Sequence, residues 1–267
     1  MSQGPTADDL WQRILAAPAD AGLKAQYVAA LEQAGDRRAK VFALSALYER
    51  LSADWSLKEN AALLKPDRDA ALGDWRTDFD LHAAAWPGRI EFVDAWPIEL
   101  TIDAAAFARQ AGAIVATIPL RHLNLTAIDD GHGVFDLPQL DQIASIDGSK
   151  QPWSDAALSA LASSTHIAAL RWLDLSNADI SESQVEILAA SPALKAVEYL
   201  NLSNNPTRDP VDAAAGYGTD WQTNRIVPES IGVPAFGAEL EARHGKIRWL
   251  NGLWNFFEDY PPSRYRF

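Results

Sequence analysis

Apolar residues recur at the 3.6-residue spacing of a helix in three stretches at the start of the chain. The three groups are Leu10, Trp11, Ile14 and Leu15; then Leu23, Tyr27, Val28 and Leu31; then Val41, Phe42, Leu44, Leu47, Tyr48 and Leu51. Pro18 and Gly35 separate the stretches, because neither residue continues a helix well. The pattern therefore predicts a small bundle of three helices within residues 1–64.

Residues 65–89 show neither helical nor strand periodicity. Pro66 and Pro87 lie in this stretch together with Trp75 and Trp86. Because proline interrupts regular backbone hydrogen bonding, we expect an irregular connection whose tryptophans pack on a core.

A second pattern begins near residue 90 and repeats along the chain. Its template has apolar residues at positions 1, 4, 6 and 11 and a small or amide residue at position 9. Three copies begin at residues 120, 170 and 197: Leu120, Leu123, Leu125 and Ile128; Leu170, Leu173, Leu175, Ala178 and Ile180; and Val197, Leu200, Leu202 and Asn205, with Thr207 in the closing place. The first two begin 50 residues apart, so a degenerate copy is expected between them, among Leu137, Leu140, Ile143 and Ile146. A first strand is expected at residues 90–95.

Helix-like stretches lie between these segments, at residues 104–111, 154–162 and 181–190. Ser154 and Ser181 stand where N-terminal caps would begin the last two helices. A strand followed by a helix at a fixed interval buries its apolar face only by stacking on its neighbours. We therefore predict an α/β solenoid over residues 90–248, with parallel strands on its concave face and helices on its convex face, after the small helical domain. Asn205 is expected to hydrogen-bond backbone groups in the turn after its strand.

Parts of the chain resemble known families. Residues 170–180 and 201–205 are similar to leucine-rich repeats of the longer, helix-containing kind. Residues 10–47 resemble the bacterial repeat-companion domain, which precedes such repeats. The matching features are Ile14-Leu15-Ala16-x-Pro18, Tyr27, Leu31-Glu32 and Gly35-Asp36-x-Arg38. The family has Ala-Asp-Trp-Leu-Glu after its tyrosine, whereas this chain has Val28-Ala29-Ala30-Leu31-Glu32 and lacks that aspartate and tryptophan.

Residues 240–249 resemble the helix and final strand that end such proteins. Together these similarities cover most of the chain. They imply a bacterial, intracellular binding module, and they imply no catalytic activity.

On each repeat strand, the residues between the buried leucines face outward on the concave surface. Stacking of the copies places Trp172 beside Tyr199, with polar side chains next to them. Exposed aromatic residues beside amides and an acid are typical of an interaction hot spot. The predicted partner-binding face consists of His122, Asn124, Arg171, Trp172, Asp174, Glu198, Tyr199 and Asn201. The alternative is that a loop or the C-terminal tail covers Trp172 and Tyr199.

Two later segments are also candidates for function. Residues 204–234 are too many for a turn between copies, so we expect a projecting loop with Tyr217, Asp220 and Trp221 as secondary contacts. A poorly ordered insertion is the alternative. Residues 249–267 carry seven aromatic side chains, which we expect to cap the open end of the solenoid rather than bind a partner.

Charge and composition narrow the function classes. The formal net charge is -13, which disfavours nucleic acid and anionic membranes and favours a protein partner, in particular a basic one. The chain has no cysteine, which excludes disulfides, thiolate zinc sites and cysteine nucleophiles. Residues 1–10 lack the features of a signal peptide, and no run of about 18 apolar residues occurs. The cytoplasm is therefore the expected compartment.

The sequence offers little support for catalysis. It has no histidine pair at metal-ligand spacing, no phosphate-binding glycine loop and no serine elbow, so we expect neither a metal nor a cofactor. The favoured function is non-catalytic protein binding through the concave face. A more specific alternative is an immunity or antitoxin-type inhibitor of a basic toxin enzyme. A third hypothesis is a hydrolase that uses residues 129–133 with Asp174, although Asp-Gly sequences favour turns.

Overall fold

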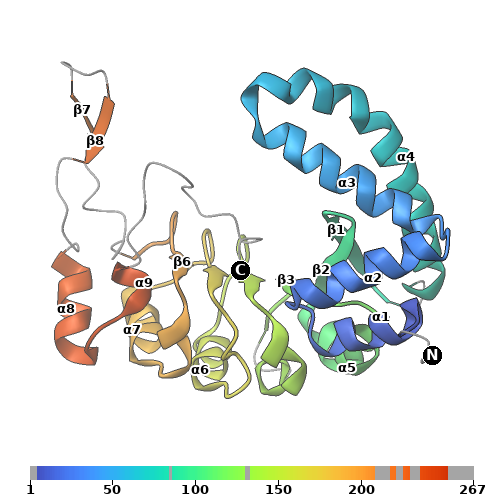
Figure 1. Cartoon of the computed structure of the whole chain (residues 1–267). Coiled ribbons are helices and arrows are strands. Elements are labelled where there is room, and N and C mark those ends of the chain that lie inside the picture. The colour runs from blue at the N-terminus through green and yellow to red at the C-terminus, as the bar shows by residue number, and fades with distance from the viewer. Residues whose placement is uncertain are drawn as a thin grey trace. The chain divides into compact units, whose positions relative to one another are not determined.

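The computed structural model describes residues 5–83, 86–129, 133–207, 217–220, 225–228 and 235–251 (Figure 1). Its helices are α1 (Ala7–Ala16), α2 (Ala21–Gln33), α3 (Arg38–Ala53), α4 (Lys58–Ala83), α5 (Ala104–Val115), α6 (Asp155–Ser163), α7 (Glu182–Ala190), α8 (Ala235–His244) and α9 (Arg248–Asn251). Short 3-10 helices are η1 (Trp55–Leu57), η2 (Val134–Asp136), η3 (Pro138–Gln142) and η4 (Ala193–Ala196). The strands are β1 (Gly88–Val93), β2 (Trp96–Asp103), β3 (His122–Thr126), β4 (Ser145–Asp147), β5 (Trp172–Asp174), β6 (Tyr199–Asn201), β7 (Tyr217–Asp220) and β8 (Arg225–Pro228).

A helical region is thus followed by an α/β region with a six-stranded, mostly parallel sheet in the order β1-β2-β3-β4-β5-β6. The chain forms two compact units. Unit 1 comprises Met1–Thr101 and Gly112–Arg121, and unit 2 comprises Ile102–Ala111 and His122–Phe267. Each unit is described separately below.

The three helices predicted at the start of unit 1 are confirmed as α1, α2 and α3. Thr6 caps α1 in a capping box with Asp9, and Asp20 caps α2 by accepting a hydrogen bond from the backbone N–H of Leu23. Gly35 follows α2 with φ +65, a left-handed conformation that glycine adopts without steric cost.

Residues 65–83 are helical, so the prediction of an irregular connection there was wrong. They belong to the long helix α4, which contains Pro66 and packs along α3. A proline inside a helix costs one backbone hydrogen bond, and burial of Ala61 and Trp75, at 4% and 5% exposure, offsets that cost. The indole Nε1 of Trp75 donates to the carbonyl of Ala95 at 3.1 Å.

Aromatic side chains form the core of unit 1. Phe42 and Trp96 have ring centroids 4.6 Å apart, and Trp11 stacks on Trp96 at 6.3 Å with an interplanar angle of 8°. Tyr27 and Trp75 also contact this group. These rings come from α1, α2, α3, α4 and β2, so one cluster connects the helices of unit 1 to its strands.

The strand expected at residues 90–95 is β1, at Gly88–Val93. A two-residue turn follows it, with Asp94 at φ 50 and Ala95 at φ 69. Positive φ at both central residues defines a type I′ turn, which joins neighbouring antiparallel strands. The chain therefore returns as β2 before α5 begins, an arrangement that the sequence pattern did not predict.

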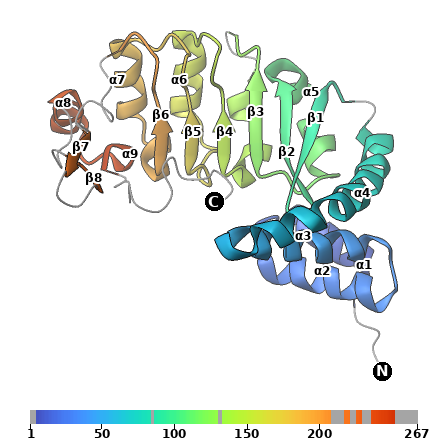
Figure 2. The ribbon, with the colours of Figure 1, turned by 90° about the horizontal axis from the view of Figure 1, so that it is seen from above.

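In unit 2, β3, β4, β5 and β6 lie side by side and parallel, as predicted (Figure 2). The register pairs His122 with Ser145, Ser145 with Trp172, and Trp172 with Tyr199, which are intervals of 23, 27 and 27 residues. Helices α6 and α7 pack against each other beside these strands. The leucines predicted to be buried are buried: Leu173 and Leu175 are at 0% exposure, and Leu200 and Leu202 are at 2% and 3%.

The degenerate copy lies further along the chain than its first two candidates suggest. Leu137 and Leu140 belong to the 3-10 region before β4, whereas Ile143 and Ile146 do occupy template positions 1 and 4. Position 6 is Gly148, where a leucine would be expected. Trp153 fills the missing volume, because a Cβ atom on Gly148 would clash with the indole ring, whose Nε1 donates to the Gly148 carbonyl at 2.8 Å.

One turn conformation recurs after each of the four strands. Position 8 of the template has positive φ in every copy, with 51° at Ala127, 60° at Lys150, 52° at Asn177 and 59° at Asn204. Such a conformation is unfavourable for residues other than glycine, asparagine and aspartate. The four segments therefore share a backbone geometry that their side chains only partly reveal.

Amide side chains connect successive turns. Asn205 donates to the carbonyls of Leu175 and Leu202, and it accepts from the N–H groups of Ala178 and Ile180. The predicted role of Asn205 is confirmed. Ala178 occupies the equivalent position in the preceding copy and has no polar side chain, so Asn205 accepts the backbone hydrogen bonds of that turn as well. Gln151 makes the equivalent connection to the preceding turn, by bonding to the backbone of Leu125 and Ile128.

A serine connects the turns on the helical side. Ser164 donates to the carbonyl of Phe135 at 2.5 Å, and Ser191 donates to the carbonyl of Ala162, in each case 29 residues earlier in the chain. The predicted caps are also confirmed, with Ser154 beginning α6 and Ser181 beginning α7.

Residues 235–251 of unit 2 contain the helices α8 and α9. Glu186 of α7 bonds to Arg243 and His244 of α8, and α9 packs beside η4. Residues 248–251 form α9, so the final strand expected there was wrong. Trp249 and Leu250 are buried at 1% and 5% exposure, whereas the rest of the predicted aromatic cap, residues 252–267, lies outside the described residues.

The left-handed turns generate a stability prediction. Substitution of Ala127 by glycine should raise the free energy of unfolding by about 0.5–1 kcal/mol, because glycine removes the steric cost of φ 51. Asn177→Ala should lower it by a similar amount. Ala113→Gly on the exposed side of α5 is the matched control and should be destabilising by about 1 kcal/mol. Urea denaturation measures all three, and a stability loss in Ala127→Gly would contradict the argument.

Packing of Trp153 over Gly148 generates a second prediction. Gly148→Ala should destabilise the protein by about 1–3 kcal/mol, because the new methyl group overlaps the indole ring. Adding Trp153→Leu to Gly148→Ala should recover part of that loss, although Trp153→Leu alone is destabilising. Gly73→Ala in α4 has open space around its Cβ and serves as control, with an expected gain of up to about 1 kcal/mol. Strict additivity of the two substitutions in thermal unfolding would refute the packing account.

Candidate functional site

Three columns of side chains run across one face of β3 to β6. Side chains alternate along a strand, so residues two apart share a face and the intervening leucines point to the other side. The first column is His122, Ser145, Trp172 and Tyr199; the second is Asn124, Asp147, Asp174 and Asn201. The third, two residues further along each strand, is Thr126, Ser149, Ser176 and Ser203.

The first column is buried. His122, Trp172 and Tyr199 are at 2%, 8% and 5% exposure, so the sequence-based prediction of exposed aromatic contacts was wrong on exposure. The predicted neighbourhood of Trp172 and Tyr199 is confirmed, since their rings stack with centroids 5.5 Å apart. The imidazole Nδ1 of His122 lies 2.8 Å from Oγ of Ser145. These side chains lie on the same side of the sheet as the second column, but they are not exposed on its surface.

The second column ends β4, β5 and β6 with Asx turns. Oδ1 of Asp174 accepts from the N–H of Ser176 at 2.8 Å, and Oδ1 of Asn201 accepts from the N–H of Ser203 at 3.0 Å. Asp147 makes the same contact to Ser149 at 3.0 Å. Such local bonds hold the side chains in one rotamer and satisfy the backbone where the strand stops.

Two carboxylates stand next to each other in the middle of this column. The register pairs Asp147 directly with Asp174, and both side chains are half-buried. Nδ2 of Asn201 donates to Oδ2 of Asp174 at 2.9 Å, while Asn124 pairs in register with Asp147. The column therefore presents two fixed negative charges flanked by two amides.

Arg171 and Glu198 hold local structure in unit 2. Arg171 donates to the carbonyls of Ala168 and Leu170, and its Nε lies 3.9 Å from Glu198. Glu198 also accepts from Arg248 of α9 at 2.7 Å. Both side chains are about a third exposed, so this ion-pair group borders the face while connecting α9 to β6.

The secondary contacts fall in a segment that was expected to be a loop. Tyr217 and Asp220 are the ends of β7, which pairs antiparallel with β8 in the register Tyr217 to Pro228 and Asp220 to Arg225. Trp221 lies outside the described residues. The segment thus contains a strand pair that the sequence analysis did not predict.

Sequence reasoning missed the polar residues of β4 and of the turn that follows it. Ser145, Asp147 and Ser149 were not predicted, because two of the four candidates for the degenerate copy, Leu137 and Leu140, lie before its first template position. A signal was available in the spacing of a short polar pattern, an Asx residue followed two positions later by Ser or Thr. It recurs at residues 124 and 126, 147 and 149, 174 and 176, and 201 and 203.

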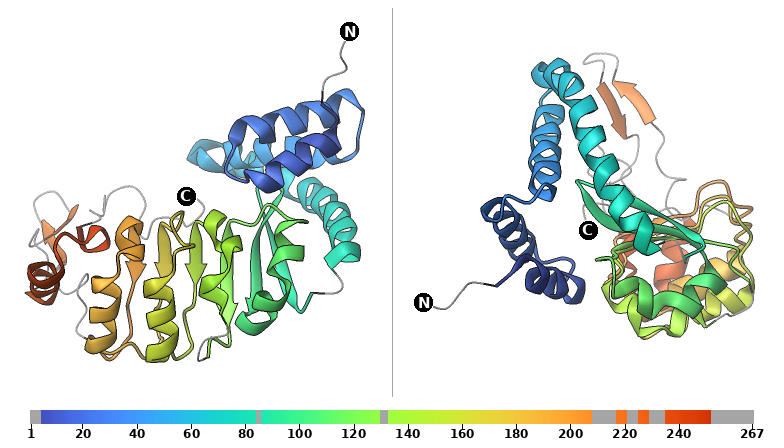
Figure 3. Two further views of the ribbon diagram at one scale, coloured as in Figure 1. Left: turned by 90° about the horizontal axis from the view of Figure 1, so that it is seen from below. Right: turned by 90° about the vertical axis from the view of Figure 1, so that its right-hand side faces the viewer.

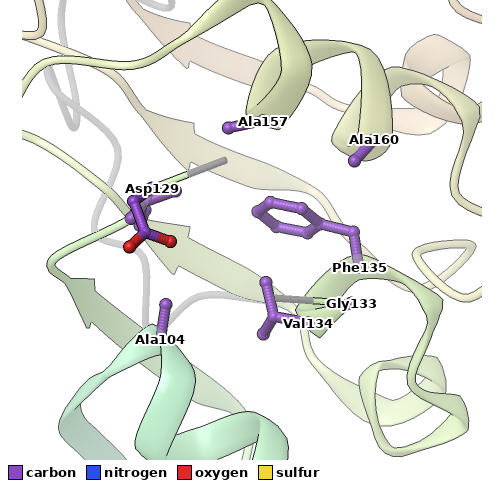
Figure 4. Close-up of a pocket in the computed structure, with 8 residues that line it drawn as sticks. Ala104, Asp129, Gly133, Val134, Phe135, Ala157 and Ala160 are labelled. Atoms are coloured by element: carbon purple, nitrogen blue, oxygen red, sulfur yellow. The ribbon is translucent and has the colours of Figure 1, made fainter. Parts of the chain in front are cut away.

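The loop considered for hydrolysis borders a small cavity (Figure 4). Asp129 and Gly133 line it together with Phe135 and alanines of α5 and α6, and its volume is about 10 Å³. That volume holds about one water molecule. Asp174 does not line this cavity, and residues 130–132 of the loop lie outside the described part of the chain.

Comparisons of the chain with protein-family models, with curated proteins and with solved structures give no match. Within the described ranges, no three His, Asp or Glu side chains converge as a metal site would require. None of the helices described is both long enough and apolar enough to span a membrane.

The apposed carboxylates of Asp147 and Asp174 generate a stability prediction. Asp147→Asn removes a like charge opposite Asp174 but retains the oxygen that accepts from Ser149, so it should raise the free energy of unfolding by roughly 0.2–1 kcal/mol. Asp147→Ala loses the Asx turn as well and should be destabilising. Chemical denaturation at low and high salt distinguishes the effects, because only the gain from asparagine should shrink with salt. A gain of the same size in alanine would count against the Asx turn.

Proposed function

We propose that residues 90–248 form a leucine-rich-repeat solenoid that binds another protein through the face of β3 to β6, without catalysis. Support comes from the regular strand register, the recurring left-handed turns and the side-chain connections by Asn205 and Ser191. Each is a feature expected of stacked units that bury their apolar faces against one another. The resemblance of residues 170–180 to leucine-rich repeats agrees with this proposal.

The observation that carries the binding proposal is the second column, Asn124, Asp147, Asp174 and Asn201, which we call the Asx column. Its side chains are half-buried, and those of Asp147, Asp174 and Asn201 are already hydrogen-bonded to their own backbone, so little conformational entropy is lost when a partner binds. Two adjacent carboxylates are suited to a lysine or arginine side chain from the partner. The net charge of -13 would favour the approach of such a partner.

The binding residues in this proposal differ from those first expected. Asn124, Asp147, Asp174 and Asn201 form the contact surface, and the stacked, buried Trp172 and Tyr199 lie beside it on the same side of the sheet. Arg171 and Glu198 lie at its border. The Asx turns and the packed rings beside them hold the polar groups in fixed positions, which a specific binding surface requires.

Inhibition of a basic toxin enzyme is the more specific form of this proposal. The apposed carboxylates and the overall acidity favour it, since an inhibitor of that type would need a fixed negative surface. Both forms predict a complex whose affinity falls as the salt concentration rises.

The test uses the full chain and two variants of equal charge. Asp147→Asn with Asp174→Asn removes the central carboxylates, whereas Glu59→Gln with Asp69→Asn removes two charges from α4. Partners captured by the wild-type chain from the native host would be identified by mass spectrometry, purified, and titrated against all three proteins by calorimetry.

The site variant should bind at least about tenfold more weakly, and the control variant should bind as the wild type does. Affinity of the wild type should fall as salt rises from about 50 to 300 mM, because the pairing is electrostatic. Equal affinity of the site and control variants would refute the role of the Asx column, and a complex insensitive to salt would refute a basic partner.

A further inference from the structure

A cleft lies within unit 1, between the first turn of α3 and the middle of α4. Its volume is about 190 Å³, and Lys40, Val41, Asp67, Ala71, Asp74 and Trp75 are among the residues that line it. The two helices run alongside each other, which Figure 3 shows for the blue and cyan helices of this unit. All of the residues that line the cleft belong to unit 1.

Three cationic residues, Arg37, Arg38 and Lys40, line the cleft on the α3 side. Neighbouring groups hold Arg38, whereas the side chain of Lys40 is available to a ligand. Arg38 donates from Nε and Nη2 to the carboxylate of Asp36, at 3.0 and 2.7 Å, and from Nη1 to the hydroxyl of Tyr27 at 3.3 Å. Its guanidinium also lies 5.8 Å from the ring centre of Trp75. The ammonium group of Lys40 makes no hydrogen bond or ion pair with any described residue.

The α4 wall carries two carboxylates, Asp67 and Asp74, which are also available to a ligand. Neither Asp67 nor Asp74 makes a side-chain hydrogen bond or ion pair within the described part of the chain. They are two helical turns apart on one side of α4, roughly 10 Å along its axis. Ala70 and Ala71 lie between them, and their small side chains leave the cleft open.

We propose that this cleft binds a basic α-amino acid group, either the free amino acid or the C-terminal residue of a peptide. Its carboxylate would pair with Lys40, its cationic side chain with Asp67 or Asp74, and its aliphatic stem would pack on Ala71 and Trp75. A volume of about 190 Å³ is below the range of roughly 300–1,000 Å³ for sites that hold drug-sized ligands, and suits one residue. The opposite charges of the two walls select a ligand that carries both signs.

Calorimetric titration of the full chain with four probes tests the proposal. The probes are L-arginine, N-acetylglycyl-L-arginine, agmatine and L-glutamate. Saturable binding is expected for L-arginine or for the acetylated dipeptide. Agmatine lacks the carboxylate and should bind about tenfold more weakly, and glutamate, which lacks a cationic side chain, should not bind. Binding of the dipeptide without binding of arginine identifies a C-terminal residue as the ligand, and the reverse identifies the free amino acid.

Variants determine whether any binding occurs in this cleft. Asp67→Asn with Asp74→Asn should weaken arginine binding about tenfold, and Ala71→Leu should abolish it by filling the space. Asp69→Asn is the matched control on the same helix, since Asp69 pairs with Arg68 and does not line the cleft. Circular dichroism and the Tm would establish that each variant is folded. No saturable binding of either arginine probe, or equal loss in the control and the double variant, would overturn the proposal.

Discussion

The parallel register of β3 to β6 is the constraint on which unit 2 depends. It aligns Leu173 with Leu200 in the core and, on the other face, Asp174 with Asn201. Side chains alternate along a strand, so a slip of one residue would turn leucines to water and charges to the core. Asn205 and Ser191 fix the register by reaching backbone atoms of the preceding turn, and these bonds cannot form in any other alignment.

Asp147, Asp174 and Asn201 serve both fold and surface. Each uses one oxygen to end its strand, which leaves the rest of the side chain at the half-buried face. The structure therefore accepts two like charges side by side at Asp147 and Asp174, an arrangement with a small electrostatic cost. A bound cation would relieve this repulsion, because it would lie close to both carboxylates. The electrostatic cost at this site is therefore consistent with its proposed function.

The sequence predicted the helices of unit 1 through α3, the parallel strands at Trp172 and Tyr199, and both serine caps. The sequence-based prediction failed where tertiary packing compensates for a residue that breaks the local pattern. Gly148 stands where the template has a leucine, and Trp153 fills that volume, so the sequence pattern does not reveal β4. Pro66 predicts a break in helical structure, but packing along α3 offsets its cost, so the pattern does not reveal most of α4. The candidate site was predicted in part, since alternation places Asp174 and Asn201 on the face. Burial of Trp172 depends on tertiary packing, which no local pattern encodes.

The Gly35-Asp36-x-Arg38 motif of the predicted repeat-companion region has a structural explanation. Gly35 permits the left-handed residue after α2, and Asp36 then accepts from the backbone N–H of Arg38 at the start of α3. Arg38 returns to the same carboxylate and reaches the Tyr27 hydroxyl, whose burial raises the pKa of Tyr27 to about 12. The motif thus fixes the angle at which α3 leaves α2. Because the motif also immobilises Arg38, Lys40 is the cation on this wall that we pair with a ligand carboxylate in the adjacent cleft.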